Sequence, residues 1–199
     1  MNFLAHLYLS GDDPDLIIGN FIADMVKGQQ INGYHSGIIR GIRLHRMIDD
    51  YTDQHPVVEK SKDRLRKKYR LYAGVVVDMY YDHFLAVHWS DYSDYRLDKY
   101  VSKAYALLND HFSILPSRVR YILPKMIEYN WLVNYADLEC LRINFGGMAR
   151  RTPFESGMSE AVNDLEQYYS LFENEFSLFF PELIRFVEQQ GVSQAHHRG

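Results

Sequence analysis

Cysteine is almost absent from this chain of 199 residues, in which Cys140 is the only one. A single cysteine cannot form an internal disulfide, so we expect a reducing compartment, the cytoplasm. No neighbouring residue marks an activating environment for the thiol. This favours a small buried apolar side chain at Cys140 over a nucleophile.

Long apolar runs and an excess of positive charge are also missing. No uncharged apolar run reaches the roughly 18 residues of a transmembrane helix, so we expect no membrane span. The first residues, MNFLAHLYLSGDDPD, have no basic leader and include His6, so we do not expect a secretory signal. The formal net charge of −4 argues against a general nucleic-acid binder, which would usually be basic.

Helical periodicity is present along the whole chain, without repeats or long linkers. It predicts a single all-α domain, a helical bundle spanning residues 1–199. The 16 Tyr and 11 Phe residues predict a core rich in aromatic side chains. The expected helices cover residues 2–10, 14–26, 37–53, 57–69, 71–89, 96–112, 116–135, 136–149 and 156–189.

Several boundaries follow from the local sequence. Asp13 can cap the second helix with Pro14 at its first position, and Ser36 can cap the third. Pro181 is expected to kink or divide the last helix. The β-branched first half of 71–89 also suits a buried strand, but no other strand-like run exists to pair with it, so we expect a helix. Residues 192–199 are expected to form a disordered tail.

Polar side chains recur in line with apolar ones on two of these helices. Asn20 and Asp24 are four residues apart in an otherwise apolar helix, which predicts one shared face and little access of Asp24 to water. His45 and Asp49 are spaced in the same way, and they continue the apolar stripe that includes Ile42.

The helix expected at 71–89 repeats the pattern. Asp78 and Asp82 lie on a stripe with Val75 and Leu85, and His83 follows directly. Burying unpaired carboxylates costs several kcal/mol, and two on one face repel each other. No Lys or Arg lies on these stripes. A shared divalent cation is therefore favoured, and His and Asp ligands suit Mn, Fe, Mg or Zn.

Simpler interpretations stay open for each residue. Any one of the aspartates can lie at a helix end or pair with an arginine of another helix, such as Arg46. His45 alone is more often a core histidine whose hydrogen bonds are satisfied. Three stripes that fit one description favour a shared metal site over three separate explanations.

Several segments resemble one known family over nearly the whole chain, in the same order and spacing. They are MNFLAHLYLS, IGNFIADMVKG, GIRLHRMIDDYTDQHP, VVVDMYYDHFLAVHW and, more loosely, NYADLECLRINFGGMARR. The resemblance is to the acyl carrier protein phosphodiesterases, described as a divergent branch of the HD-type metal phosphohydrolases. It implies an HD-like helical fold, a cytoplasmic hydrolase and manganese as the usual metal, with Mg²⁺ or Fe²⁺ as alternatives.

The reaction that this resemblance implies is hydrolysis of the phosphodiester between 4′-phosphopantetheine and a serine of holo-acyl carrier protein. The sequence departs from the HD superfamily in one respect, because it contains no adjacent His-Asp pair. It offers His45-x3-Asp49 and the reversed Asp82-His83 instead. Positions that match the family's motifs are His6, Asn20, Asp24, His45, Arg46, Asp49, Asp53, Asp78, Asp82 and His83.

Roles follow from the stripes and the resemblance together. Asp24, His45 and Asp78 are the first candidate metal ligands, and His6 is a further candidate. Asp49 and Asp82 are expected either to bind the metal or to orient the histidines. Three residues are candidates for catalysis beside the metal. Asp82 or His83 is expected to protonate the leaving serine oxygen, and Arg46 to contact the phosphate or a ligand carboxylate.

A basic stretch, VVEKSKDRLRKKYR at 57–70, is a candidate docking surface for the acidic carrier protein, or simply a solvated helix face. Its candidate residues are Arg64, Arg66, Lys67 and Lys68. Arg150 and Arg151 form a second candidate. Two rival functions remain: an HD-like phosphohydrolase acting on nucleotides or small phosphate esters, and a non-catalytic module that binds acyl carrier protein. A helical transcription regulator is disfavoured because no recognition helix is evident.

Overall fold

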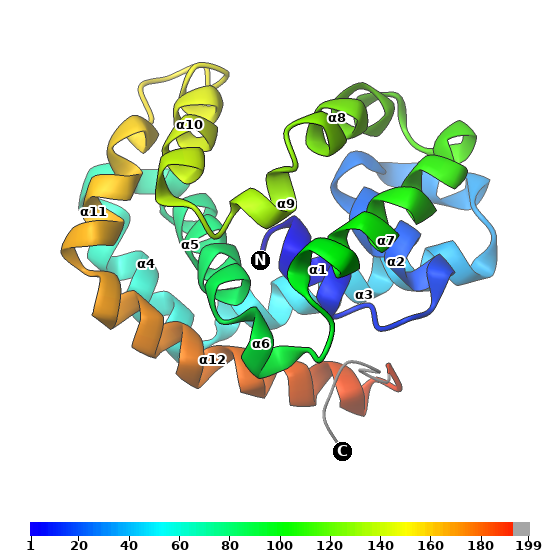
Figure 1. The fold of residues 1–199 in the computed structure, drawn as a ribbon, viewed down its shortest axis with the longest axis horizontal. Coiled ribbons are helices and arrows are strands. Elements are labelled where there is room, and N and C mark those ends of the chain that lie inside the picture. The colour runs from blue at the N-terminus through cyan, green and yellow to red at the C-terminus, as the bar shows by residue number, and fades with distance from the viewer. Residues whose placement is uncertain (193–199) are drawn as a thin grey trace.

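The computed structural model describes residues 1–192 and contains no β-strand within them (Figure 1). The all-α prediction is confirmed, and the segment that also suited a strand lies in a helix. The α-helices are α1 (Phe3–Tyr8), α2 (Pro14–Ile22), α3 (Ser36–Gln54), α4 (Pro56–Tyr69), α5 (Ala73–Val87), α6 (Trp89–Tyr92), α7 (Leu97–Asp110), α8 (Ser117–Glu128), α9 (Trp131–Asn134), α10 (Leu138–Ala149), α11 (Ala161–Gln167) and α12 (Tyr169–Gln189). Short 3₁₀ turns are η1 (Ala23–Met25), η2 (Gly28–Gly33), η3 (Arg70–Tyr72), η4 (Phe112–Ile114) and η5 (Met158–Glu160).

Most expected helices are present, with some boundaries displaced. The Asp13 carboxylate accepts hydrogen bonds from the first turn of α2, and Pro14 begins that helix, as predicted. Ser36 is the first residue of α3 rather than its cap. The single helix expected at 116–135 is two helices, because Asn130 has a left-handed backbone with φ +46°.

The C-terminal helix divides at a different point from the one expected. The break lies at Tyr168, between α11 and α12, while α12 runs on through Pro181. A proline inside a helix removes one backbone hydrogen bond. Buried side chains precede and follow it, with Phe180 on one side and Leu183 on the other, and their packing holds α12 together. The predicted tail lies, from residue 193 onward, outside the described residues.

The longest helix, α12, runs along one edge of the molecule and packs on α3, α4 and α5 (Figure 1). In the same view α8 and α10 stand on opposite sides of α9, and the N-terminus lies between them. The core contains many buried aromatic rings, among them Tyr8, Tyr80, Phe84 and Phe176, as the composition predicts. Among residues 1–192, no helix combines the length and the apolarity that a bilayer crossing requires.

Helices α2 and α3 are in direct backbone contact where Gly19 meets Gly41. A β-carbon added at Gly19 would lie 2.1 Å from the carbonyl oxygen of Ile38. One added at Gly41 would lie 2.6 Å from the carbonyl oxygen of Leu16. Only glycine permits this approach, which brings polar side chains of the two helices within hydrogen-bonding distance.

Candidate metal centre

Two imidazoles and two carboxylates meet where α1, η1 and α3 converge. The His6 and His45 rings are stacked, with centroids 3.9 Å apart. Asp49 lies between the rings' Nε2 atoms, with Oδ1 3.1 Å from His6 and Oδ2 3.0 Å from His45. Asp24 Oδ1 is 3.1 Å from the same Nε2 of His45. One ligand atom from each of His6, His45 and Asp49 lies within 4.8 Å of the other two, so a single ion can contact all three.

The cluster spans the boundary between core and solvent. The two histidines are buried, whereas the Asp24 side chain is 66% exposed and that of Asp49 is 38% exposed. The expectation that Asp24 has little access to water is therefore wrong. Helix α2 ends at Ile22, and the η1 turn that follows carries Asp24 to the surface while keeping it against His45.

The charges in the cluster are strongly coupled. Burial disfavours the His45 cation, but hydrogen bonds to Asp24 and Asp49 outweigh it and raise the His45 pKa to about 9. Burial and the neighbouring His45 charge lower the His6 pKa to about 4. Burial alone would raise the pKa of Asp49, but the two imidazoles outweigh burial and hold that pKa well below its usual range. The position between the carboxylates and His45 Nε2 is therefore one where the protein favours a positive charge.

Asp78 lies beside the cluster and contacts the N-terminal ammonium. The Met1 nitrogen donates a hydrogen bond to Asp78 Oδ1 at 3.0 Å and is 3.7 Å from Asp49 Oδ1. Burial raises the pKa of the Asp78 carboxyl, although the ammonium opposes that shift. The N-terminal ammonium therefore contacts both Asp78 and Asp49 of the cluster, and the role of Asp78 as a metal ligand stays a prediction.

Asp82 is fully buried and binds the beginning of α1. Its carboxylate accepts hydrogen bonds from the backbone N–H groups of Asn2, Leu4 and Ala5, at 3.2, 2.7 and 3.4 Å. Burial raises the Asp82 pKa to about 7, while the ammonium and these amides oppose the shift. This carboxylate holds in place the helix that carries His6, and its role as the proton donor to the leaving serine oxygen stays a prediction.

The hydrogen bonds of His83 lie outside the histidine–aspartate cluster, and Arg46 directly follows His45 on α3. His83 Nδ1 donates to the Tyr135 carbonyl at 2.8 Å, and its Nε2 accepts from the Tyr169 hydroxyl at 3.1 Å. Both ring nitrogens are therefore engaged away from the cluster, and burial lowers the His83 pKa. Arg46 is exposed on α3 and forms no ion pair with another residue of the described chain. Their catalytic roles stay predictions.

Asn20 is the residue whose importance the sequence did not reveal. Its side chain is fully buried and contacts both His45 and the first helix. In sequence its position four residues before Asp24 and its match to the resembling family's motifs marked it, but neither signal assigned it a role. Beside it, His6 Nδ1 is buried without a hydrogen-bond partner among residues 1–192.

The predicted docking residues on α4 are largely paired within the molecule. Arg64 forms two hydrogen bonds of 2.7 Å with Glu175 of α12. Arg66 contacts Glu59 and Asp63 of its own helix. Lys68 contacts Asp164 of α11, whereas Lys67 is exposed with no ion pair in the described part of the chain. Much of the positive charge evident in sequence is therefore neutralised in the fold.

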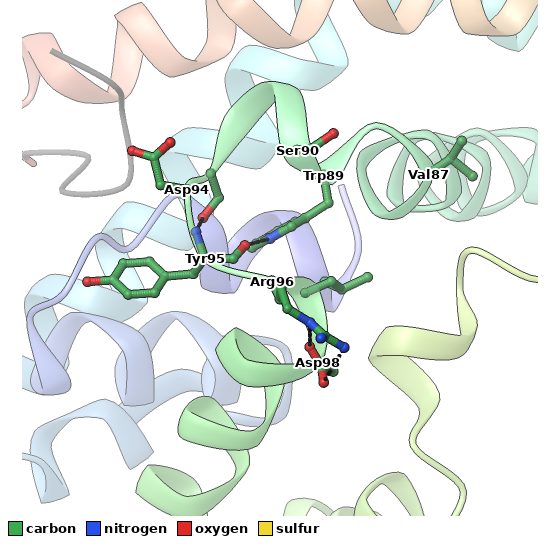
Figure 2. A pocket seen from close by; sticks show the side chains of 9 residues that line it. Val87, Trp89, Ser90, Asp94, Tyr95, Arg96 and Asp98 are labelled. Atoms are coloured by element: carbon green, nitrogen blue, oxygen red, sulfur yellow. Dashed lines mark hydrogen bonds and ion pairs between the residues drawn. The ribbon is translucent and has the colours of Figure 1, made fainter.

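A shallow pocket lies elsewhere, between the end of α5 and the beginning of α7 (Figure 2). Figure 2 shows Arg96 paired with Asp98 on its wall. No residue of the histidine–aspartate cluster lines it, so we do not assign it a part in the chemistry.

Comparisons with known proteins agree on one family. The family model "Acyl carrier protein phosphodiesterase" matches residues 1–183. Relatives carrying that name occur in Photorhabdus laumondii (34% identity, covering 96% of both chains) and Yersinia enterocolitica (31%, 96% of this chain and 100% of the relative). A third, from Pectobacterium atrosepticum, is 30% identical over 96% of this chain and 99% of its own. No solved structure matches. The chain therefore belongs to the acyl carrier protein phosphodiesterase family.

Proposed function

We propose that this chain is a metal-dependent phosphodiesterase. It hydrolyses the bond between 4′-phosphopantetheine and a serine of holo-acyl carrier protein, and it leaves the apo-carrier protein. Family membership over nearly the whole chain supports the substrate. The observation that carries the chemistry is the convergence of His6, His45 and Asp49, with Asp24 at its exposed edge. The lone Cys140, which forms no disulfide, is compatible with a cytoplasmic setting.

The donor set fits a divalent cation. Two ligands about 2.1 Å from one ion and at right angles to each other are roughly 3 Å apart. The nitrogen–oxygen separations of 3.0–3.1 Å around His45 and Asp49 match that spacing. Mixed imidazole and carboxylate donors suit Mn²⁺ or Fe²⁺, with Mg²⁺ possible where oxygen donors dominate. His6, His45 and Asp49 would hold the ion, together with Asp24.

A bound divalent cation supplies two things here: a more acidic water and a polarised phosphoryl oxygen. Side chains of the protein accept the proton and bind the phosphate. Asp24 is the most exposed side chain of the cluster, and its carboxylate has a second oxygen beside the one that faces His45, which can accept a proton from a water molecule. Arg46 directly follows His45 and is exposed, so its guanidinium is available to an incoming phosphate.

The experiment is incubation with holo-carrier protein and Mn²⁺ after chelator treatment, followed by mass measurement for loss of the pantetheine arm. We expect turnover only when metal is restored. His45→Gln and Asp49→Asn should each lower kcat/KM at least 100-fold, beyond the roughly 10–100-fold that residues supporting a ligand cost. Asp50→Asn, a change on the exposed side of α3, is the matched control and should keep wild-type activity.

Two results would overturn the proposal. Hydrolysis of free nucleotides, with holo-carrier protein left intact, would select the nucleotide phosphohydrolase. Stable binding of carrier protein, with neither turnover nor bound metal, would select a non-catalytic binding module.

A further inference from the structure

Asn20 is a buried junction between the helices that carry the two histidines. Its Nδ2 donates to the backbone carbonyl of His6 at 2.9 Å and to the Ser10 hydroxyl oxygen at 2.9 Å. Its Oδ1 faces His45 Nδ1 at 3.0 Å. One amide on α2 therefore contacts the main chain of α1 and a side chain of α3.

The hydrogen bonds fix which way this amide is turned. The His6 carbonyl can only accept, so the amide nitrogen must face it. The Ser10 hydroxyl donates its own proton to the same carbonyl at 2.7 Å, so it accepts from Asn20. The remaining amide atom, Oδ1, is an acceptor without a proton to give. The His45 nitrogen that faces it must therefore carry the hydrogen.

We propose that Asn20 is a positioning residue that holds His45 in the Nδ1–H tautomer and so keeps Nε2 open to a metal ion. This inference rests on the proposed metal-dependent function. In the other neutral tautomer, the Nδ1 lone pair would face the Oδ1 lone pairs of Asn20 across 3.0 Å, which is repulsive.

The carboxylates make this constraint necessary. Asp24 and Asp49 lie 3.1 and 3.0 Å from His45 Nε2, and both are hydrogen-bond acceptors. Left alone, a neutral His45 would place its proton on Nε2 and donate it to them, which would block the position that a metal ion needs. Asn20 disfavours the Nε2–H tautomer, because its Oδ1 faces Nδ1 on the opposite side of the ring. The same amide also fixes the main chain at His6, so it sets both imidazoles at once.

Two substitutions separate this role from simple packing. Asn20→Leu is close in size and removes both the acceptor for His45 and the donors to α1. Asn20→Asp keeps an acceptor oxygen for His45 Nδ1 but loses the same donors. Ser10→Ala is the matched control, because it removes the neighbouring hydroxyl and leaves the contact between Asn20 and His45.

The first measurement is Zn²⁺ and Mn²⁺ affinity by calorimetry on the full chain, with circular dichroism as the check on folding. Asn20→Leu should weaken binding about 10–100-fold, in the range typical of residues that orient a ligand histidine. Asn20→Asp should stay within about tenfold of wild type, and Ser10→Ala within about threefold. If Asn20→Asp is as weak as Asn20→Leu, or if Asn20→Leu binds like wild type, the proposal is wrong.

The second measurement is the tautomer itself, read from long-range proton–nitrogen correlations of the His45 ring. It uses metal-free protein at a pH where the ring is neutral, so it does not depend on catalysis. Wild type and Asn20→Asp should show Nδ1–H, and Asn20→Leu should shift towards Nε2–H. An Nε2–H ring in wild type would overturn the inference. A wild-type protein that binds no metal, but whose His45 carries the proton on Nδ1, would contradict the proposed function alone.

Discussion

The His45 imidazole has hydrogen-bonding groups on both sides: an amide oxygen faces Nδ1, and two carboxylates face Nε2. Without a metal, a proton on Nε2 is the charge that satisfies these acceptors, which is why the His45 pKa rises to about 9. Metal and proton therefore compete for one nitrogen, and metal affinity should increase with pH up to that value.

The free energy of unfolding of the metal-free protein should depend on whether His45 carries this proton. Because the folded pKa of His45 exceeds the unfolded value near 6.5, the ring stabilises the fold fully below pH 6.5 and loses that effect as pH rises through about 9. His45→Gln should therefore be most destabilising below pH 6.5, by up to about 3 kcal/mol, and less so at pH 9. Denaturant unfolding in chelator at several pH values measures this difference. A destabilisation that does not vary with pH would contradict it.

The site residues were predictable from sequence only where helix geometry is regular. His45 and Asp49 share α3, so their spacing correctly predicts that they lie on one face. Asp24 was misplaced because the end of α2 at Ile22 leaves no signal distinct enough to read. The partners of Asp78 and Asp82 come from the first residues of the chain, and only tertiary structure brings these segments together.

Helix α1 has only six residues, and Asp82 of α5 accepts hydrogen bonds from the backbone N–H groups at its beginning. An isolated helix of that length is unstable, since the first turn costs more entropy than its bonds return. Asp82 binds N–H groups at the beginning of α1, where the helix dipole favours negative charge. The position of His6 one turn later therefore depends on α5.

Asp82→Asn should destabilise the protein, because an amide can turn an N–H group towards backbone donors and carries no charge to bind them. We expect a loss of about 1–3 kcal/mol in the free energy of unfolding, together with weaker metal binding through displacement of His6. Chemical denaturation and calorimetry measure the two effects. Asp50→Asn again serves as control, and equal stability of the two variants would show that Asp82 does not anchor α1.

The close contact between α2 and α3 at Gly19 and Gly41 predicts that neither glycine can be replaced without separating the helices. An added β-carbon at Gly41 would meet backbone atoms 2.6–2.9 Å away, and the backbone cannot move aside unless the helices separate. Gly41→Ala should therefore cost about 1–3 kcal/mol and lower metal affinity, because His45 moves away from Asn20.

The control for this prediction is Gly74→Ala in α5. Its β-carbon would meet only the flexible end of Lys62, at 3.8 Å. Alanine should therefore be neutral there, or stabilising by roughly 0.5–1 kcal/mol, since it favours helix over glycine. Thermal unfolding of both variants is the measurement. Equal effects of the two substitutions would mean that the close contact does not matter.

The arrangement of the helices explains what the periodicity could and could not predict. Long amphipathic helices such as α3, α4 and α7 lie close to their expected ranges, since an apolar face repeated over several turns is a strong signal. Breaks that depend on one residue, such as the left-handed Asn130, carry no periodic signal. The same holds for the short 3₁₀ turns, which tertiary packing selects.

Charge across the surface bears on how an acidic carrier protein approaches. The α4 cations are mostly paired, so their field is weakened, whereas Arg150 and Arg151 are exposed and form no ion pair with residues 1–192. Complementary charge mainly raises association rates and is screened by salt. We therefore expect the pair Arg150→Glu and Arg151→Glu to lower kcat/KM on carrier protein more than Arg66→Glu with Lys67→Glu.

The measurement is kcat/KM on holo-carrier protein at several salt concentrations. The Arg150 and Arg151 reversals should flatten its salt dependence, while hydrolysis of a small phosphodiester stays unchanged in both double variants. A salt dependence that only the α4 reversals alter would place docking on that helix, as the sequence first indicated. If neither double variant changes the salt dependence of kcat/KM, neither surface docks the carrier protein.

The cluster residues all come from the segment before residue 50, whereas α7 to α12 contribute none of them. Changes in the later helices therefore leave the ion-binding groups themselves in place. Chimaeras that exchange α7 to α12 between relatives should keep their metal affinity as long as α12 still packs on α3, α4 and α5.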